Sequence, residues 1–86
     1  MPTVWKLYVE EQKAKSVAEL AVGESGVIQG FSNEDLALKL LEMGCLPGET
    51  VTLNFKAPLG DPISIRILDY DLSIRMNEAA SITLEG

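Results

Sequence analysis

Three consecutive segments in the second half of the chain alternate apolar and polar residues with a period of two. Successive side chains of a β-strand point to opposite faces, so each segment predicts a strand that buries one face. The side chains expected to face inward are Val51, Leu53 and Phe55, then Ile63, Ile65 and Ile67, then Leu72, Ile74 and Met76. The loop APLGDP (residues 57–62) and the tight reversal DYD (residues 69–71) separate the segments, so neighbouring strands are expected to pair.

The clearest helix is predicted at about residues 33–43, upstream of this alternating region. Ser32 or Asn33 can accept hydrogen bonds from the free N–H groups of its first turn. Leu38 lies away from the apolar stripe of the helix and is expected to be exposed. The stripe consists of Leu36, Leu40 and Met43, with Ala37 and Leu41 beside it.

The stretch EMGCLPGETVTL (residues 42–53) ends that helix and starts the next strand within a few residues. Gly44 can adopt the positive φ that follows many helix C-termini, which would place Cys45 against Leu40. Pro47 and Gly48 predict a type II turn, because proline fixes φ and glycine supplies a positive φ. This segment therefore predicts architecture rather than catalysis.

The stretch SVAELAVGESG predicts a single helical turn before the first strand. Ser16 is a plausible N-cap residue with Glu19 as its capping-box partner, and Gly23 is expected to end the turn. Val17 and Leu20 face the same side and are expected to fill one end of the core.

The first and last strands are predicted in GVIQGF and ITL. Gly26 and Gly30 bracket the first of them, and such glycines often mark a bend that lets one strand serve two sheets. Before the last strand, which contains Ile82 and Leu84, NEAAS predicts a helical turn capped by Asn77. About five short strands with one inserted helix favour a small, partly open β-barrel.

Composition restricts the class of protein. A chain of 86 residues fits one small domain. The net charge of −6, from 7 basic and 13 acidic residues, opposes binding to nucleic acid or to an anionic membrane. The charge either only aids solubility or suits a basic partner surface. There is no signal-peptide pattern, and no apolar run approaches the ~20 residues of a membrane helix. We therefore expect a cytoplasmic protein without direct membrane insertion.

The residue types also argue against catalysis. The chain has no histidine and a single cysteine, so a catalytic triad, a Cys-rich zinc site and an internal disulfide are excluded. Asp61, Asp69 and Asp71 offer oxygen ligands, but they lie in different turns without metal-ligand spacing, and we expect them to serve the turns. Cys45 is expected to be a buried helix cap rather than a redox sensor. The sequence predicts no enzyme, no cofactor and no metal site.

The segments LLEMGCLPGETVTL and APLGDPISIRILDYDLSIRMNEAASITL resemble the ferrous iron transport protein A (FeoA) family. The resemblance covers about residues 16–85, which would form the domain 16–86. It implies an SH3-like β-barrel and a cytoplasmic accessory role with ferrous iron transport protein B, a membrane permease that carries a GTP-binding domain. Many family members have glycine where this chain has Asp69, a residue that also tolerates a left-handed turn.

The resemblance also leaves an alternative function. Similar domains occur at the C-terminus of some metal-dependent transcriptional repressors, where they regulate. The alternative is therefore a stand-alone SH3-like regulatory domain. The helix pair that would bind DNA in such a repressor is not recognisable in this acidic chain.

Five residues are candidates for binding a partner: Met43, Leu46, Pro58, Leu59 and Arg75. Leu59 occupies the tip of a proline-stiffened loop, where an apolar side chain either binds a partner or folds back on the barrel. The groove between this loop and the helix end is the preferred docking surface. Arg66 and Arg75 are expected to point outward, to form surface ion pairs or, for Arg75, to contact the partner GTPase.

The N-terminal extension, residues 1–15, differs from the rest of the chain because it contains Trp5 and Tyr8. Its periodicity fits a helix and a two-sided strand equally well. The extension is expected to dock on another surface or to form a homodimer.

Overall fold

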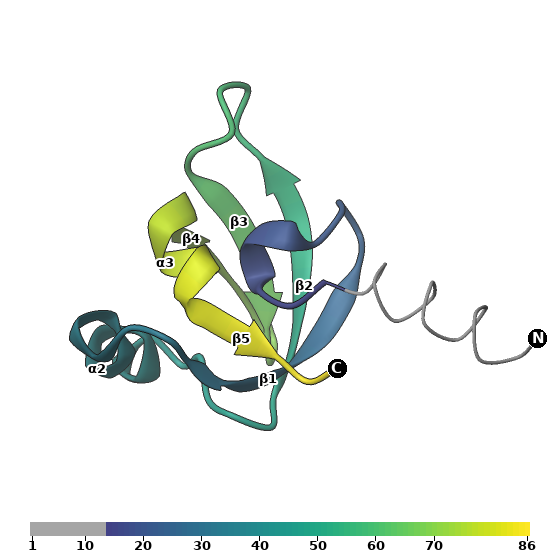
Figure 1. The fold of residues 1–86 in the computed structure, drawn as a ribbon. Helices are drawn as coiled ribbons and strands as arrows, with labels where there is room; N and C mark the ends of the chain where they lie inside the picture. The colour runs from purple at the N-terminus through teal and green to yellow at the C-terminus, as the bar shows by residue number, and fades with distance from the viewer. Residues whose placement is uncertain (1–13) are drawn as a thin grey trace, which may run out of the picture.

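The computed structural model describes residues 14–86. The expectations for Trp5 and Tyr8 lie outside the described residues. In chain order, the elements are η1 (Val17–Glu19), β1 (Ser25–Phe31), α2 (Glu34–Glu42), β2 (Thr50–Lys56), β3 (Ile63–Ile67), β4 (Tyr70–Ile74), α3 (Met76–Ser81) and β5 (Ile82–Leu84). The five strands form one antiparallel sheet in the order β4-β3-β2-β1-β5 (Figure 1). The mainly β, SH3-like fold with one inserted helix is the predicted class.

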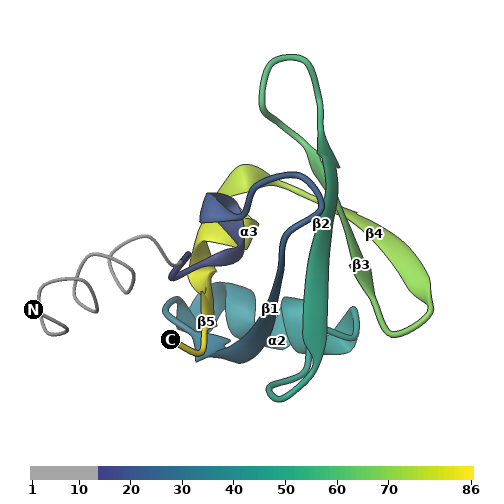
Figure 2. The ribbon, with the colours of Figure 1, turned by 90° about the vertical axis from the view of Figure 1, so that its right-hand side faces the viewer.

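The strand β1 belongs to two parts of the sheet. Its first half pairs with β2, from Ser25 to Val27, and its second half pairs with β5. The register of the β1–β5 pairing shifts between Ile28 and Gly30, so a bulge lies within this second pairing. The predicted bend is confirmed. The curled sheet leaves β4 and β5 as its two ends, and α2 and the β2–β3 loop lie at opposite ends of the molecule (Figure 2).

The inward side chains of the alternating segments form the core, with one exception. Val51, Leu53 and the three isoleucines of β3 are at most 1% exposed. Phe55, which was expected inside, is 60% exposed, so that prediction is wrong. The reason is a bulge between Leu53 and Phe55, which makes Asn54 an extra residue and sets Phe55 opposite the outward Ser64.

The third alternating segment also ends sooner than predicted. Ile74 is buried, but Leu72 and Met76 are only partly buried, and Met76 already belongs to α3. The N-cap residue of α3 is Arg75 rather than the predicted Asn77. The Glu78 side chain accepts a hydrogen bond from the Arg75 backbone N–H, at 2.8 Å, and so takes the part of a capping-box acid.

The end of α2 follows its prediction closely. Gly44 has a φ of 103°, and the backbone N–H groups of Gly44 and Cys45 donate to Leu41 and Leu40. These two bonds define a Schellman motif, which leaves Cys45 fully buried. The following Pro47–Gly48 turn closes with a bond from the N–H of Glu49 to the carbonyl of Leu46, and Gly48 has a φ of 92°.

Two turns differ from their predictions. The first turn, η1, ends at Glu19 rather than at Gly23, and Ser16 makes no side-chain capping bond. Glu19 instead accepts from the N–H of Lys15. In the β3–β4 hairpin the left-handed residue is Leu68, with a φ of 54°, rather than Asp69. Val17 and Leu20 nevertheless lie in the core as predicted.

Within residues 14–86 no helix is long and apolar enough to cross a membrane.

Candidate functional site

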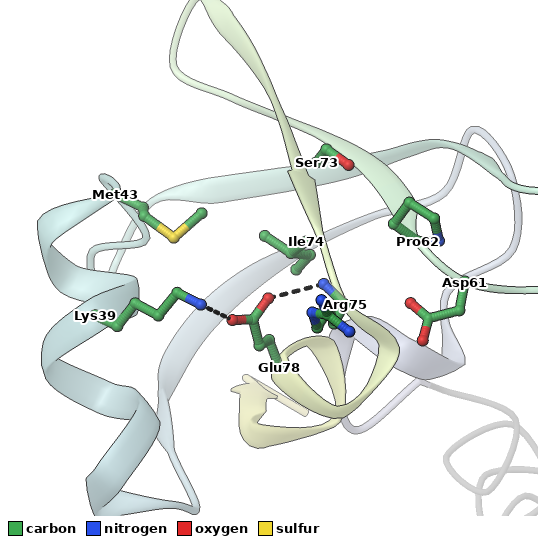
Figure 3. Close-up of a pocket in the computed structure, with 8 residues that line it drawn as sticks. All are labelled: Lys39, Met43, Asp61, Pro62, Ser73, Ile74, Arg75 and Glu78. Atoms are coloured by element: carbon green, nitrogen blue, oxygen red, sulfur yellow. Dashed lines mark hydrogen bonds and ion pairs between the residues drawn. The ribbon is translucent and has the colours of Figure 1, made fainter.

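A cleft of about 470 Å³ opens where α2, α3, β4 and the end of the β2–β3 loop meet (Figure 3). The helices contribute charged side chains to it, and the strands contribute mostly small or apolar ones. Its lining consists of Lys39, Met43, Asp61, Pro62, Ser73, Ile74, Arg75 and Glu78. The cleft therefore combines an apolar floor with a charged rim, which suits a segment that carries both kinds of side chain.

Glu78 is the central charge of the cleft. Its side chain is 5% exposed, and both carboxylate oxygens have partners. One accepts from the ammonium of Lys39 at 2.5 Å, and the other accepts from the N–H of Arg75 at 2.8 Å. The hydrogen bond from Lys39, followed by that from Arg75, holds the pKa of Glu78 below its usual range, although burial acts in the opposite direction. The Glu78 carboxylate therefore has a structural role, because each of its oxygens already accepts a hydrogen bond from another part of the fold.

The Lys39–Glu78 pair ties two elements that are distant in sequence. Lys39 lies in the last turn of α2, whereas Glu78 lies in the first turn of α3. Each charge also stabilises its own helix through the helix dipole. A cation such as Lys39 stabilises a helix C-terminus, and an anion such as Glu78 stabilises an N-terminus. On the other side of the cleft, the Asp61 carboxylate accepts from the N–H of Met76 at 2.9 Å. These bonds fix the walls of the cleft.

The predicted partner-binding residues lie in three places: the cleft, the turn between α2 and β2 that contains Leu46, and the β2–β3 loop. Met43 and Arg75 line the cleft, whereas Leu46, Pro58 and Leu59 do not. Leu59 is 96% exposed at the loop tip, so the alternative in which it folds back on the barrel is wrong. The tip is closed by a bond from the N–H of Gly60 to the carbonyl of Ala57.

The two arginines of the prediction differ in their surroundings. Arg66 pairs with Asp71 across the β3–β4 hairpin at 3.1 Å, as expected of a surface ion pair. Arg75 is exposed and forms no ion pair with any of the residues that the structure describes. Its guanidinium therefore remains available at the rim of the cleft.

Sequence reasoning missed Lys39 and Glu78, and it expected Asp61 only to serve its own turn, whereas Asp61 accepts a hydrogen bond from Met76 across the cleft. One signal was present, because Glu78 stands three residues after Arg75, at the spacing of a capping box. An arginine is an unusual N-cap residue, however, and Asn77 offered a more favourable one. The pairing of Lys39 with Glu78 joins positions 39 residues apart and has no local sequence signal.

The described residues offer little for catalysis. No group of three or more acidic or cysteine side chains within residues 14–86 is placed to hold a metal ion. Burial, and then the negative charge of Glu78, raise the pKa of the Cys45 thiol, which keeps it protonated and unreactive.

Comparison with known proteins gives consistent results. The sequence model of the FeoA domain matches residues 15–86. A curated relative from Porphyromonas gingivalis, the Fe(2+) transport protein A/Fe(2+) transporter FeoB fusion protein, is 40% identical over 70 residues. That match covers 80% of this chain but only 8% of the relative, so the chain spans less than a tenth of that protein's length.

Solved structures give the same answer for the fold. A FeoA-like protein from Clostridium acetobutylicum has a TM-score of 0.75 and 30% identity, over 85% of this chain and 88% of that one. FeoA of Stenotrophomonas maltophilia, solved with zinc and described as an SH3 domain protein, has a TM-score of 0.71 and 26% identity, over 84% and 91% of the two chains. A manganese-dependent transcriptional repressor has a TM-score of 0.72, over 81% of this chain and 40% of that one, but only 11% identity, so the likeness concerns the fold alone.

Proposed function

Because this chain belongs to the FeoA domain family, we propose that it is a non-enzymatic, cytoplasmic accessory protein of ferrous iron uptake that binds the cytosolic part of the GTP-binding permease, ferrous iron transport protein B. Membership of the family supports a role in ferrous iron transport. The proposal adds the mode of action, which is contact between proteins.

The fusion relative is the observation that carries this proposal. In that protein a domain 40% identical to this chain is joined to the transporter FeoB in one polypeptide. Fusion keeps two domains at a high effective concentration, which favours pairs that act together. The repressor alternative has less support, because its structural neighbour shares only 11% identity.

The proposed docking surface consists of the cleft and the β2–β3 loop, whose last residues, Asp61 and Pro62, line the cleft and whose tip carries Leu59. Met43 and Arg75 contribute from the cleft, and Leu46, Pro58 and Leu59 are the candidates outside it. A leucine that is 96% exposed contributes almost nothing to the core. An apolar side chain held out on a short, closed loop is typical of residues that bind partners.

The test is binding to the purified cytosolic part of the permease, with Leu59→Glu compared against Leu38→Glu. Leu38 is a matched control, because it is 67% exposed and lies on α2, at the other end of the molecule from the loop (Figure 1). We expect Leu59→Glu to weaken binding at least about tenfold, as for a central interface residue. We expect both variants to change unfolding by no more than about 0.5 kcal/mol, as for other surface substitutions.

Two outcomes would contradict the proposal at different levels. Equal binding by Leu59→Glu and Leu38→Glu would remove the loop tip from the docking surface. Absence of binding by the unmodified chain would remove the permease as its partner.

A further inference from the structure

The strand β4 forms an end of the sheet, and its outer edge is open. It pairs only with β3, in the register that sets Ile67 opposite Tyr70 across a two-residue turn. In such a hairpin the closing pair is hydrogen-bonded, and the pairs then alternate, so Tyr70, Leu72 and Ile74 bond to β3. The N–H and C=O groups of Asp71 and Ser73 therefore point away from β3. Neither residue has another backbone partner within residues 14–86.

This edge lacks the usual protection. Proteins commonly guard an edge strand with lysine, proline or a bulge. β4 has the sequence YDLSI, which contains neither residue, and its register with β3 is unbroken over all five positions. The one charge in β4, Asp71, is engaged by Arg66.

The open edge borders the cleft. Three consecutive residues at the end of β4 line the cleft opposite Met43 of the α2 C-terminus: Ser73, Ile74 and Arg75 (Figure 3). At the other end of β4, the Tyr70 hydroxyl donates to the carbonyl of Met43 at 3.1 Å and joins the strand to the helix end. A segment laid along β4 therefore has free backbone groups at Asp71 and Ser73 and an apolar floor beside them.

The charges at the rim indicate the chemistry of the occupant. The ammonium of Lys39 is already paired with Glu78, and one carboxylate oxygen of Asp61 already accepts a hydrogen bond from the N–H of Met76. Arg75 has a whole guanidinium free of ion pairs among the described residues. A guanidinium binds a carboxylate with two parallel hydrogen bonds, which fixes both position and orientation.

We propose that β4 receives an extended segment of the partner protein as an additional strand of the sheet. The segment carries an acidic side chain that pairs with Arg75 and an apolar side chain that fills the floor formed by Met43 and Ile74. Main-chain hydrogen bonds to Asp71 and Ser73 supply affinity, and the two side chains supply specificity. This inference rests on the proposed function and defines the surface and the type of segment involved.

Ser73→Pro tests the edge directly, with Ser73→Ala as its control. Proline removes the N–H that points away from β3 and leaves the bonds between β3 and β4, so an edge position tolerates it. With the purified cytosolic part of the permease as the probe, we expect Ser73→Pro to weaken binding at least about tenfold, whereas Ser73→Ala stays within about threefold of the unmodified chain. Arg75→Glu is expected to weaken binding to a similar extent, because the new carboxylate would repel the acidic side chain of the partner segment.

Amide hydrogen exchange on the unmodified chain tests the same edge without any substitution. Saturation with the permease fragment is expected to slow exchange at Asp71 and Ser73 at least about tenfold, because both amides become hydrogen-bonded. This measurement decides the question even if Ser73→Pro fails to fold.

The outcomes separate this inference from the proposed function. If the chain binds the fragment while both amides keep exchanging rapidly, the edge is not the site, and the proposed function stands. If the chain does not bind the fragment, both fail. If both amides become protected as the protein concentration rises in the absence of the fragment, a second copy occupies the edge, and the inference is wrong.

Discussion

Gly44→Ala is expected to destabilise the fold for two separable reasons. A φ of 103° is in the region that L-residues avoid, and this costs roughly 1–2 kcal/mol. In addition, the new Cβ would overlap the Tyr70 hydroxyl oxygen, so the tyrosine must move and lose its bond to the Met43 carbonyl. That bond is worth about 0.5–1.5 kcal/mol. The expected total is about 1.5–3.5 kcal/mol.

Gly48→Ala is the matched control for this prediction. Gly48 has a similar φ of 92°, but a Cβ there meets no atom within 4 Å. It should therefore show only the backbone cost of roughly 1–2 kcal/mol. Urea unfolding followed by far-ultraviolet circular dichroism measures both variants, with an unchanged m-value required for the comparison. Equal losses for Gly44→Ala and Gly48→Ala would refute the role given to Tyr70.

Three further predictions follow from single side chains. Glu78→Gln should cost about 1–3 kcal/mol at pH 7, because it removes the charge that Lys39 pairs with. Since the folded-state pKa of Glu78 is lowered from 4.5, this contribution is complete above that pH and is lost as pH falls through the folded-state pKa. The difference in unfolding free energy between the unmodified chain and the variant should therefore shrink in acid. An equal difference at pH 7 and pH 3 would count against a stabilising charge on Glu78. Cys45, buried and with a raised pKa, should react with a thiol reagent only at the rate of unfolding, and rapid labelling of the native chain would contradict this. Leu68→Gly should stabilise the chain by about 0.5–1 kcal/mol in urea unfolding, because glycine accepts the φ of 54° without a Cβ clash, and a loss of stability would oppose that reading.

The sequence was most informative where one residue type determines the local structure. The isoleucines of β3 alternate strictly and all face inward. Gly44 and Gly48 adopt the positive φ angles predicted for them, because few other residues can. Leu68 could not be predicted as the left-handed residue, since leucine is among the types that avoid that conformation.

The candidate site was predicted only in part, for a different reason. Met43 and Leu59 could be found because an exposed or terminal apolar side chain is conspicuous in a sequence. The Lys39–Glu78 pair depends on how α2 and α3 pack, and the open edge of β4 depends on the order of the strands. Such features arise only from tertiary structure, so local patterns do not contain them.

The extra residue in β2 has a consequence for any comparison between this chain and its relatives. Asn54 reverses the phase of alternation, so odd positions point to the core before it and to solvent after it. Deleting Asn54 would remove the bulge and leave Phe55 directly after Leu53, still opposite Ser64 and facing outward. A relative that lacks this residue must therefore be aligned with a gap opposite Asn54, because an alignment without the gap would match inward positions with outward ones over the stretch that leads into the β2–β3 loop.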